Sequence, residues 1–111
     1  MNQEEFDKVL AMWDTYLSKL FDAKGNEYAR GDRLSNFKKA AAVLNGTPES
    51  ALRGFLVKHL VSIFDMIDDL DSGVHHPMEK WMEKLGDNVA YLILLSALIT
   101  ERIQNGTPRG L

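Results

Sequence analysis

Apolar residues recur at steps of three and four along most of the chain, the spacing at which side chains share one side of an α-helix. The first such stretch is 3–24. Its apolar positions are Phe6, Val9, Leu10, Trp13, Tyr16, Leu17, Leu20 and Phe21. Gly25 and Asn26 predict its end, because both tolerate the left-handed backbone conformation common at helix C-termini. The pattern therefore predicts an amphipathic helix over 3–24.

Two further helices are predicted in the middle of the chain. A short one over 34–45 is capped by Asp32 or Ser35 and ended by Asn45 and Gly46. A longer one over 48–71 starts after Thr47, which is a favoured N-cap residue. Its apolar side consists of Leu52, Phe55, Leu56, Leu60, Ile63, Ile67 and Leu70.

The fourth predicted helix, over 77–104, contains an uncharged run at 89–99. This run is too short to cross a bilayer, which requires about 20 apolar residues. We therefore expect it to be the central helix of a water-soluble bundle. Asp87 and Tyr91 are four residues apart on this helix, so they share a face at the edge of the apolar run. A carboxylate at that place needs a partner.

No stretch alternates as a β-strand does, and short loops join the four helical patterns, so the predicted fold is an all-α four-helix bundle. We expect one domain over 1–105 and a flexible tail over 106–111. The apolar faces of the first, third and fourth helices are wider than one bundle of 111 residues can cover. This excess predicts a homo-oligomer, because large exposed apolar patches are rare on monomers.

Composition narrows the classes of partner and compartment. The net charge is −3, and Lys and Arg are scattered among acids, which argues against a nucleic-acid surface. The chain has no cysteine, which excludes disulfides and thiolate zinc sites. It also lacks a signal-peptide pattern and a membrane span, so we expect a cytoplasmic protein, in the host cytoplasm if phage-encoded.

Four short motifs occur in a fixed order along the chain: Glu27-Tyr28, Asn36-Phe37, Lys58 and the run GDNVAY at 86–91. With these motifs the chain resembles domains of phages and bacteria named for association with nucleotide modification, and more distantly the MazG-like all-α nucleoside triphosphate pyrophosphohydrolases. The resemblance covers roughly 24–102. It implies a MazG-like fold, a dimer or tetramer, and a nucleotide ligand.

In the pyrophosphohydrolases, acids in the patterns EExxE and ExxD hold magnesium on the phosphates. Asp87 matches the aspartate of the second pattern, but Lys84 stands where its glutamate is expected, and Glu83 is one position away. The residues that stand where the first cluster of glutamates is expected are Lys58, His59 and Ser62. The resemblance thus implies Mg²⁺ at Asp87 and Glu83 with an incomplete acidic motif. It leaves open whether a triphosphate is hydrolysed to monophosphate and pyrophosphate.

The side chains that suit a nucleotide are Tyr28, Asn36, Lys58, Asp87 and Tyr91. Lys58 offers a charge to phosphate, Tyr28 a ring to a base, and Asp87 an acceptor to a sugar or an amine. Alternatively, Asp87 pairs with Lys58 between two packed helices, and Tyr91 completes the pair. Three functions therefore remain open: a nucleotide-handling domain with or without hydrolysis, a non-catalytic phage protein that sequesters a nucleotide or nucleotide-derived signal, and an oligomerisation module without a small ligand.

Overall fold

The computed structural model describes residues 1–27 and 31–106, with the backbone alone at 24–27. Four helices make up the described chain: α1 (Gln3–Glu27), α2 (Ser35–Leu44), α3 (Pro48–Asp71) and α4 (Met78–Gln104). No strand occurs at 1–27 or 31–106. The all-α class and the four predicted helices are confirmed.

The chain forms two compact units, Met1–Arg33 and Leu34–Leu111. The first unit contains α1, and the second contains α2, α3 and α4. The single domain over 1–105 and the four-helix packing stay predictions. The expected flexible tail falls, apart from Gly106, outside the described residues.

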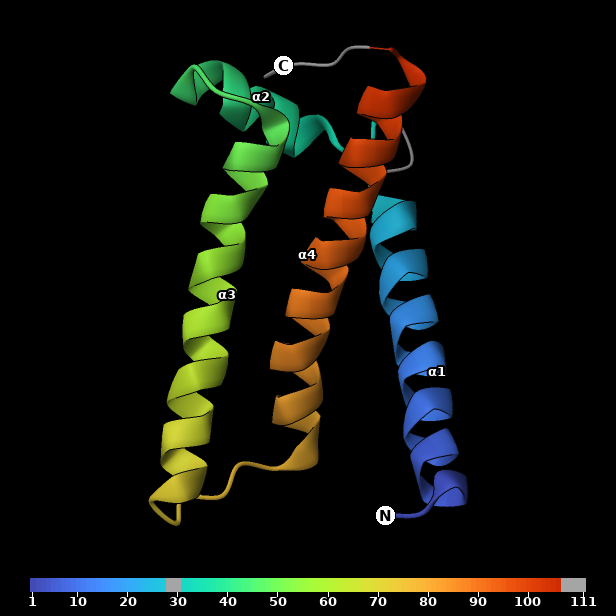
Figure 1. The fold of residues 1–111 in the computed structure, drawn as a ribbon, viewed down its shortest axis with the longest axis vertical. Coiled ribbons are helices and arrows are strands. Elements are labelled where there is room, and N and C mark those ends of the chain that lie inside the picture. The colour runs from blue at the N-terminus through green and yellow to red at the C-terminus, as the bar shows by residue number, and fades with distance from the viewer. Residues whose placement is uncertain (28–30, 107–111) are drawn as a thin grey trace. The chain divides into compact units, whose positions relative to one another are not determined.

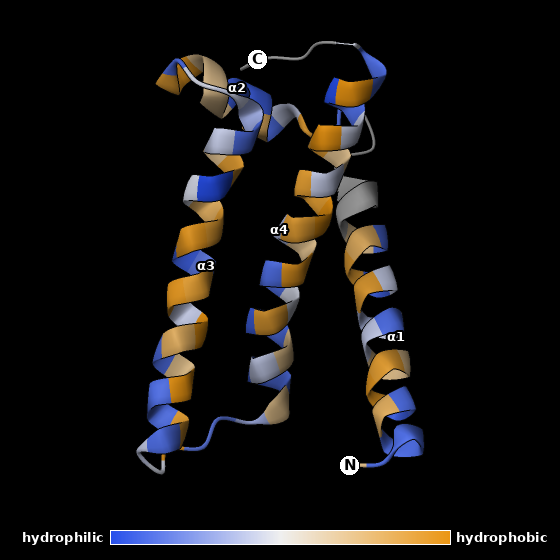
Figure 2. Ribbon diagram, viewed as in Figure 1, coloured by the Kyte–Doolittle hydropathy of each residue, from blue (hydrophilic) through white to orange (hydrophobic). Residues whose placement is uncertain are grey.

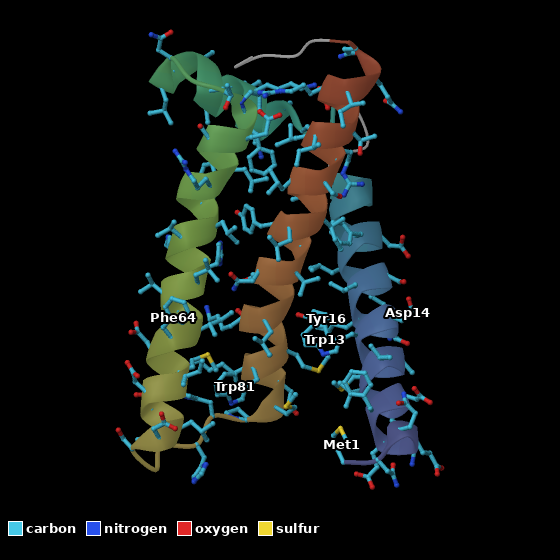
Figure 3. All side chains as sticks on the ribbon, in the orientation of Figure 1. Met1, Trp13, Asp14, Tyr16, Phe64 and Trp81 are labelled. Atoms are coloured by element: carbon cyan, nitrogen blue, oxygen red, sulfur yellow. The ribbon has the colours of Figure 1, made fainter. Side chains whose placement is uncertain are left out.

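In the first unit, α1 begins with a side-chain cap and extends further than predicted. The backbone N–H of Glu5 donates to Oδ1 of Asn2 at 2.8 Å. Trp13 and Tyr16 make an edge-to-face contact with ring centroids 5.6 Å apart (Figure 3). The helix continues through Gly25 and Asn26, so the end predicted there is wrong. A glycine inside a helix costs only about 1 kcal/mol, which good helix formers around it can offset.

At the start of α2, tertiary packing replaces the predicted side-chain cap. Leu34 occupies the N-cap position without a side-chain cap hydrogen bond, and Ser35 is already the first helical residue. The predicted cap by Asp32 or Ser35 is wrong, because the buried Leu34 side chain sets where the chain enters the helix. The predicted end is confirmed, since Asn45 adopts the left-handed conformation with φ 54°.

The start of α3 follows the sequence signal. Thr47 is the N-cap, and its Oγ1 accepts a hydrogen bond from the backbone N–H of Ser50 at 3.1 Å. Pro48 occupies the first turn, where its missing N–H costs no helical hydrogen bond. In the last helix, Asn105 is the C-cap of α4, so the predicted end at 104 is confirmed.

We expect Thr47→Ala to lower the free energy of unfolding by about 1 kcal/mol, because one of the orphan N–H groups of α3 loses its acceptor. Urea unfolding followed by circular dichroism measures this change. Thr100→Ala serves as the matched control, because the hydroxyl of Thr100 donates to the carbonyl of Ser96 within α4 and caps no helix end. If Thr100→Ala lowers the free energy of unfolding as much as Thr47→Ala does, the capping role of Thr47 is contradicted.

The core of the second unit lies where its three helices meet. The helices α3 and α4 run antiparallel side by side, and α2 lies across the end where α3 begins and α4 ends (Figure 1). Leu52 of α3 is 0% exposed and packs with buried residues from the other two helices. Those residues are Leu34, Phe37 and Leu98.

Apolar residues also recur along α3 and α4 outside this core (Figure 2). Several of them are exposed, including Val57, Phe64 and Ile67 on α3. Within the described ranges, no helix combines the length and hydropathy needed to span a membrane.

Candidate functional site

Three side chains midway along α3 and α4 form a polar group that we call the His59 cluster: His59, Asp87 and Tyr91. Nδ1 of His59 lies 3.7 Å from Oδ2 of Asp87. The rings of His59 and Tyr91 have centroids 4.9 Å apart. All three side chains are half-buried. The arrangement brings an acid, an imidazole and a phenol together between two packed helices.

Aromatic rings form one wall of the His59 cluster. Tyr91 stacks on Phe55 with centroids 6.5 Å apart and an interplanar angle of 16°. Phe37 of α2 packs edge-on against both rings, at 6.1 Å from Phe55 and 6.2 Å from Tyr91. Phe37 is buried, whereas Phe55 is 45% exposed. Phe55 therefore presents part of an aromatic surface to solvent beside the polar atoms of the cluster.

Beside the cluster, Asn88 ties the two long helices together. Its Nδ2 donates to the backbone carbonyls of His59 at 3.2 Å and Lys84 at 2.9 Å. Asn88 is 6% exposed, and its Oδ1 has no hydrogen-bond partner within the part of the chain that the structure describes. Because Asn88 holds the backbone of His59, it helps to set the position of the His59 side chain relative to α4.

The structure places His59, and not Lys58, beside Asp87. Adjacent residues on a helix point about 100° apart, so only one of the two can face α4. His59 lies on the inner side, whereas Lys58 is exposed. The alternative in which Asp87 pairs with Lys58 is therefore corrected. Lys58 remains next to the cluster, on one line with Ser62 four residues later.

Two members of the site, His59 and Phe55, were not singled out from the sequence. A signal for His59 exists, since it lies three and four residues from Leu56 and Ile63 on the apolar side of α3. Sequence alone does not distinguish a histidine that fills a core from one that faces a carboxylate.

The other predicted site residues lie apart from the cluster or outside the described chain. Asn36 is exposed on α2, and no hydrogen bond or ion pair joins it to the cluster among the described residues. Tyr28 lies outside the described residues. Glu83 is exposed, with Oε1 at 3.9 Å from Nζ of Lys84. No group of three or more His, Asp or Glu side chains suited to a metal ion occurs at 1–23 or 31–106, where side chains are described.

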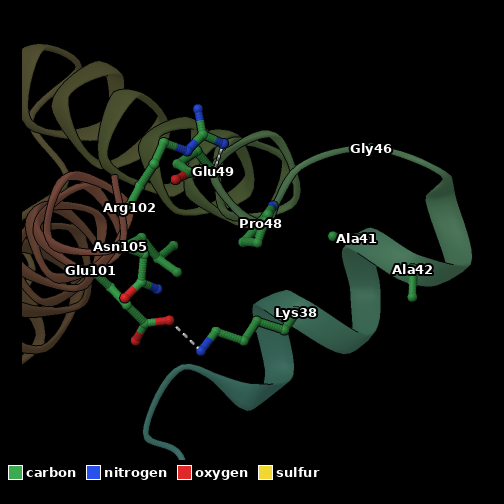
Figure 4. Close-up of a pocket in the computed structure, with 10 residues that line it drawn as sticks. Lys38, Ala41, Ala42, Gly46, Pro48, Glu49, Glu101, Arg102 and Asn105 are labelled. Carbon is green, nitrogen blue, oxygen red and sulfur yellow. Dashed lines mark hydrogen bonds and ion pairs between the residues drawn. The ribbon is translucent and has the colours of Figure 1, made fainter. Parts of the chain in front are cut away.

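A separate cavity of about 360 Å³ opens between the end of α2, the start of α3 and the end of α4 (Figure 4). Nζ of Lys38 lies 2.5 Å from Oε1 of Glu101. The guanidinium of Arg102 donates to Oε2 of Glu49 at 2.7 Å. Each cation in the lining thus faces an acid, so an anionic ligand would have to break an existing ion pair to bind there. We therefore base the functional argument on the His59 cluster.

Comparison of the chain with protein-family models, curated proteins and solved structures found no match. The resemblance drawn from the short motifs stays a prediction.

Proposed function

We propose that the second unit binds a nucleotide, or a modified nucleotide, at the His59 cluster. The observation that carries the proposal is the half-buried carboxylate of Asp87. Among the described residues its one ion-pair contact is with His59, and 3.7 Å is too long for a hydrogen bond. The Asp87 side chain is 32% exposed, so water or a ligand that carries donors can reach its oxygens. A ligand with hydroxyl or amine donors would satisfy Asp87.

The surroundings of the cluster suit the other parts of a nucleotide. Lys58 is exposed at the edge of the cluster and makes no ion pair with any described residue, so its ammonium group is available to a phosphate. The exposed part of the Phe55 ring offers a surface on which a base can stack. Each part of a nucleotide thus has a complementary side chain within a few helical turns. Phe55 suits the base, Asp87 the sugar or an amine, and Lys58 the phosphate.

The chemistry of these groups favours binding over metal-dependent hydrolysis. Magnesium prefers several oxygen ligands that meet at one point. Here Asp87 has the imidazole of His59 beside it, and Glu83 has the ammonium group of Lys84 beside it. Each of these acids thus already faces a nitrogen-bearing side chain, which competes with a metal ion for the carboxylate. We therefore propose a binder, with hydrolysis as an outcome that the experiment must test.

We expect Lys58→Ala to weaken nucleotide binding by about 10- to 150-fold, because a charge-assisted contact is commonly worth about 1.5–3 kcal/mol. A panel of nucleoside mono-, di- and triphosphates is first screened for a rise in melting temperature. Titration calorimetry then gives the dissociation constant of the best ligand. The melting temperature without ligand should not change, since the Lys58 side chain is exposed.

Lys39→Ala is the matched control, because it removes an exposed lysine of α2 and should leave affinity unchanged. If no nucleotide raises the melting temperature, or if Lys58→Ala binds as tightly as wild type, the proposal is wrong. Release of pyrophosphate from a triphosphate in the presence of Mg²⁺ would show a hydrolase in place of a binder.

A further inference from the structure

Six residues of α3 recur at alternating steps of four and three, which is the spacing of a coiled-coil seam. We call them the α3 seam: Arg53, Val57, Leu60, Phe64, Ile67 and Asp71. The four central positions are apolar, and the two ends carry opposite charges. This pattern is separate from the buried side of α3, which contains Ala51, Leu52 and Met66.

Within the second unit, neither α2 nor α4 covers most of the α3 seam, although Leu60 is half-buried. Phe64, which is labelled on α3 in Figure 3, is 56% exposed. Val57 and Ile67 are also exposed. Val61, which is exposed, borders the seam on one side, and the half-buried Ile63 borders it on the other. Neither Arg53 nor Asp71 makes an ion pair with any described residue. An apolar strip of this length, with an unpaired charge at each end, is suited to another helix.

The seam is complementary to itself when it is reversed. The apolar seam residues are placed symmetrically about position 62. Val57 and Ile67 are each five residues from it, and Leu60 and Phe64 are each two residues from it. The same register brings Arg53 opposite Asp71. An antiparallel pair of α3 helices, centred at the level of residue 62, therefore forms four apolar layers closed by an ion pair at each end. A parallel pair would instead place like charges beside each other.

We infer that the partner of the α3 seam is a second copy of this chain, bound antiparallel about a two-fold axis. Charge complementarity selects this partner, because the seam supplies both members of each ion pair. The interface is isologous, so the assembly closes as a dimer. Lys58 and His59 are not part of the seam, so the dimer leaves the proposed ligand site open. The two proposals therefore succeed or fail independently.

The first test is the mass of the full chain in solution, measured by sedimentation equilibrium over a range of concentrations. Wild type should sediment at twice the monomer mass of 12.5 kDa. Phe64→Glu should raise the dissociation constant of the dimer at least about 100-fold, because it places a charge in two of the apolar layers. Val43→Glu is the matched control, since Val43 is exposed on α2 away from the seam, and this variant should remain dimeric. Circular dichroism should show equal helix content in all three proteins.

The second test determines the orientation by exchanging charges. Arg53→Asp alone and Asp71→Arg alone should each weaken the dimer about tenfold, because each creates two like-charge pairs. The double variant Arg53→Asp/Asp71→Arg should recover wild-type affinity, since each ion pair re-forms with its charges exchanged. The inference is overturned if wild type is a monomer at about 100 µM, because a stable dimer has a dissociation constant below about that value. It is also overturned if Phe64→Glu stays dimeric, or if the double variant is no tighter than the single ones.

Discussion

Leu52→Ala should lower the free energy of unfolding of the second unit by about 2–5 kcal/mol. Leu52 is 0% exposed and packs against Leu34, Phe37 and Leu98 from the two neighbouring helices. Truncation removes apolar contacts on all sides and leaves a cavity where the three helices meet. The higher helix propensity of alanine offsets only a few tenths of a kcal/mol. Because stabilities of small domains are commonly about 5–15 kcal/mol, a loss of this size is a large part of the total.

Chemical unfolding in urea, followed by circular dichroism, measures this loss. Leu44→Ala is the matched control, because it makes the same chemical change at a leucine of α2 that is 70% exposed. The control should change stability by no more than about 0.5 kcal/mol. Equal losses in the two variants would show that Leu52 does not occupy the core described here.

Asn88→Asp should lower the free energy of unfolding by about 3–5 kcal/mol at neutral pH, because it buries a charge without a compensating donor. The Nδ2 of Asn88 donates to the carbonyls of His59 and Lys84 at 3.2 and 2.9 Å. A carboxylate at this position would direct negative oxygen toward two carbonyl oxygens. The loss should shrink as the pH falls, since protonation removes the charge and restores one donor.

Asn88→Leu separates the electrostatic penalty from the loss of hydrogen bonds. It removes both donors without adding a charge, and it should cost about 1–2 kcal/mol, with no dependence on pH. Unfolding curves of the two variants at pH 4.5 and 7.5, values chosen around the usual carboxylate range, measure both effects. An Asn88→Asp variant as stable as wild type at both pH values would contradict the placement of Asn88 between the helices.

The helices could be predicted from the sequence because their signals are local. A threonine before a proline starts α3, and an asparagine ends α2, in both cases through bonds within one helical turn. The start of α2 could not be predicted in the same way. Burial of Leu34 against residues of α3 and α4 decides it, and those residues are distant in sequence.

Part of the candidate site could also be predicted. Asp87 and Tyr91 were identified because a carboxylate and a phenol at the edge of an apolar run need partners, and that requirement follows from their spacing on one helix. Their partner on α3 could not be predicted, because it depends on the rotation of one packed helix about its own axis. Lys58 and His59 point about 100° apart on α3, and no local pattern shows which of the two meets Asp87.

The sequence by itself determined the all-α class, the number of helices and most of their ends, since these depend on periodicity and on short-range capping. It also contains the heptad spacing of the α3 seam. Only the tertiary structure decided which residues of α3 face α4 and which remain exposed. Packing in three dimensions brought His59 to Asp87, buried Asn88 against the backbone of α3, and left the side of α3 around Phe64 uncovered by α2 and α4. These outcomes depend on contacts between residues far apart in the chain, and no local pattern encodes them.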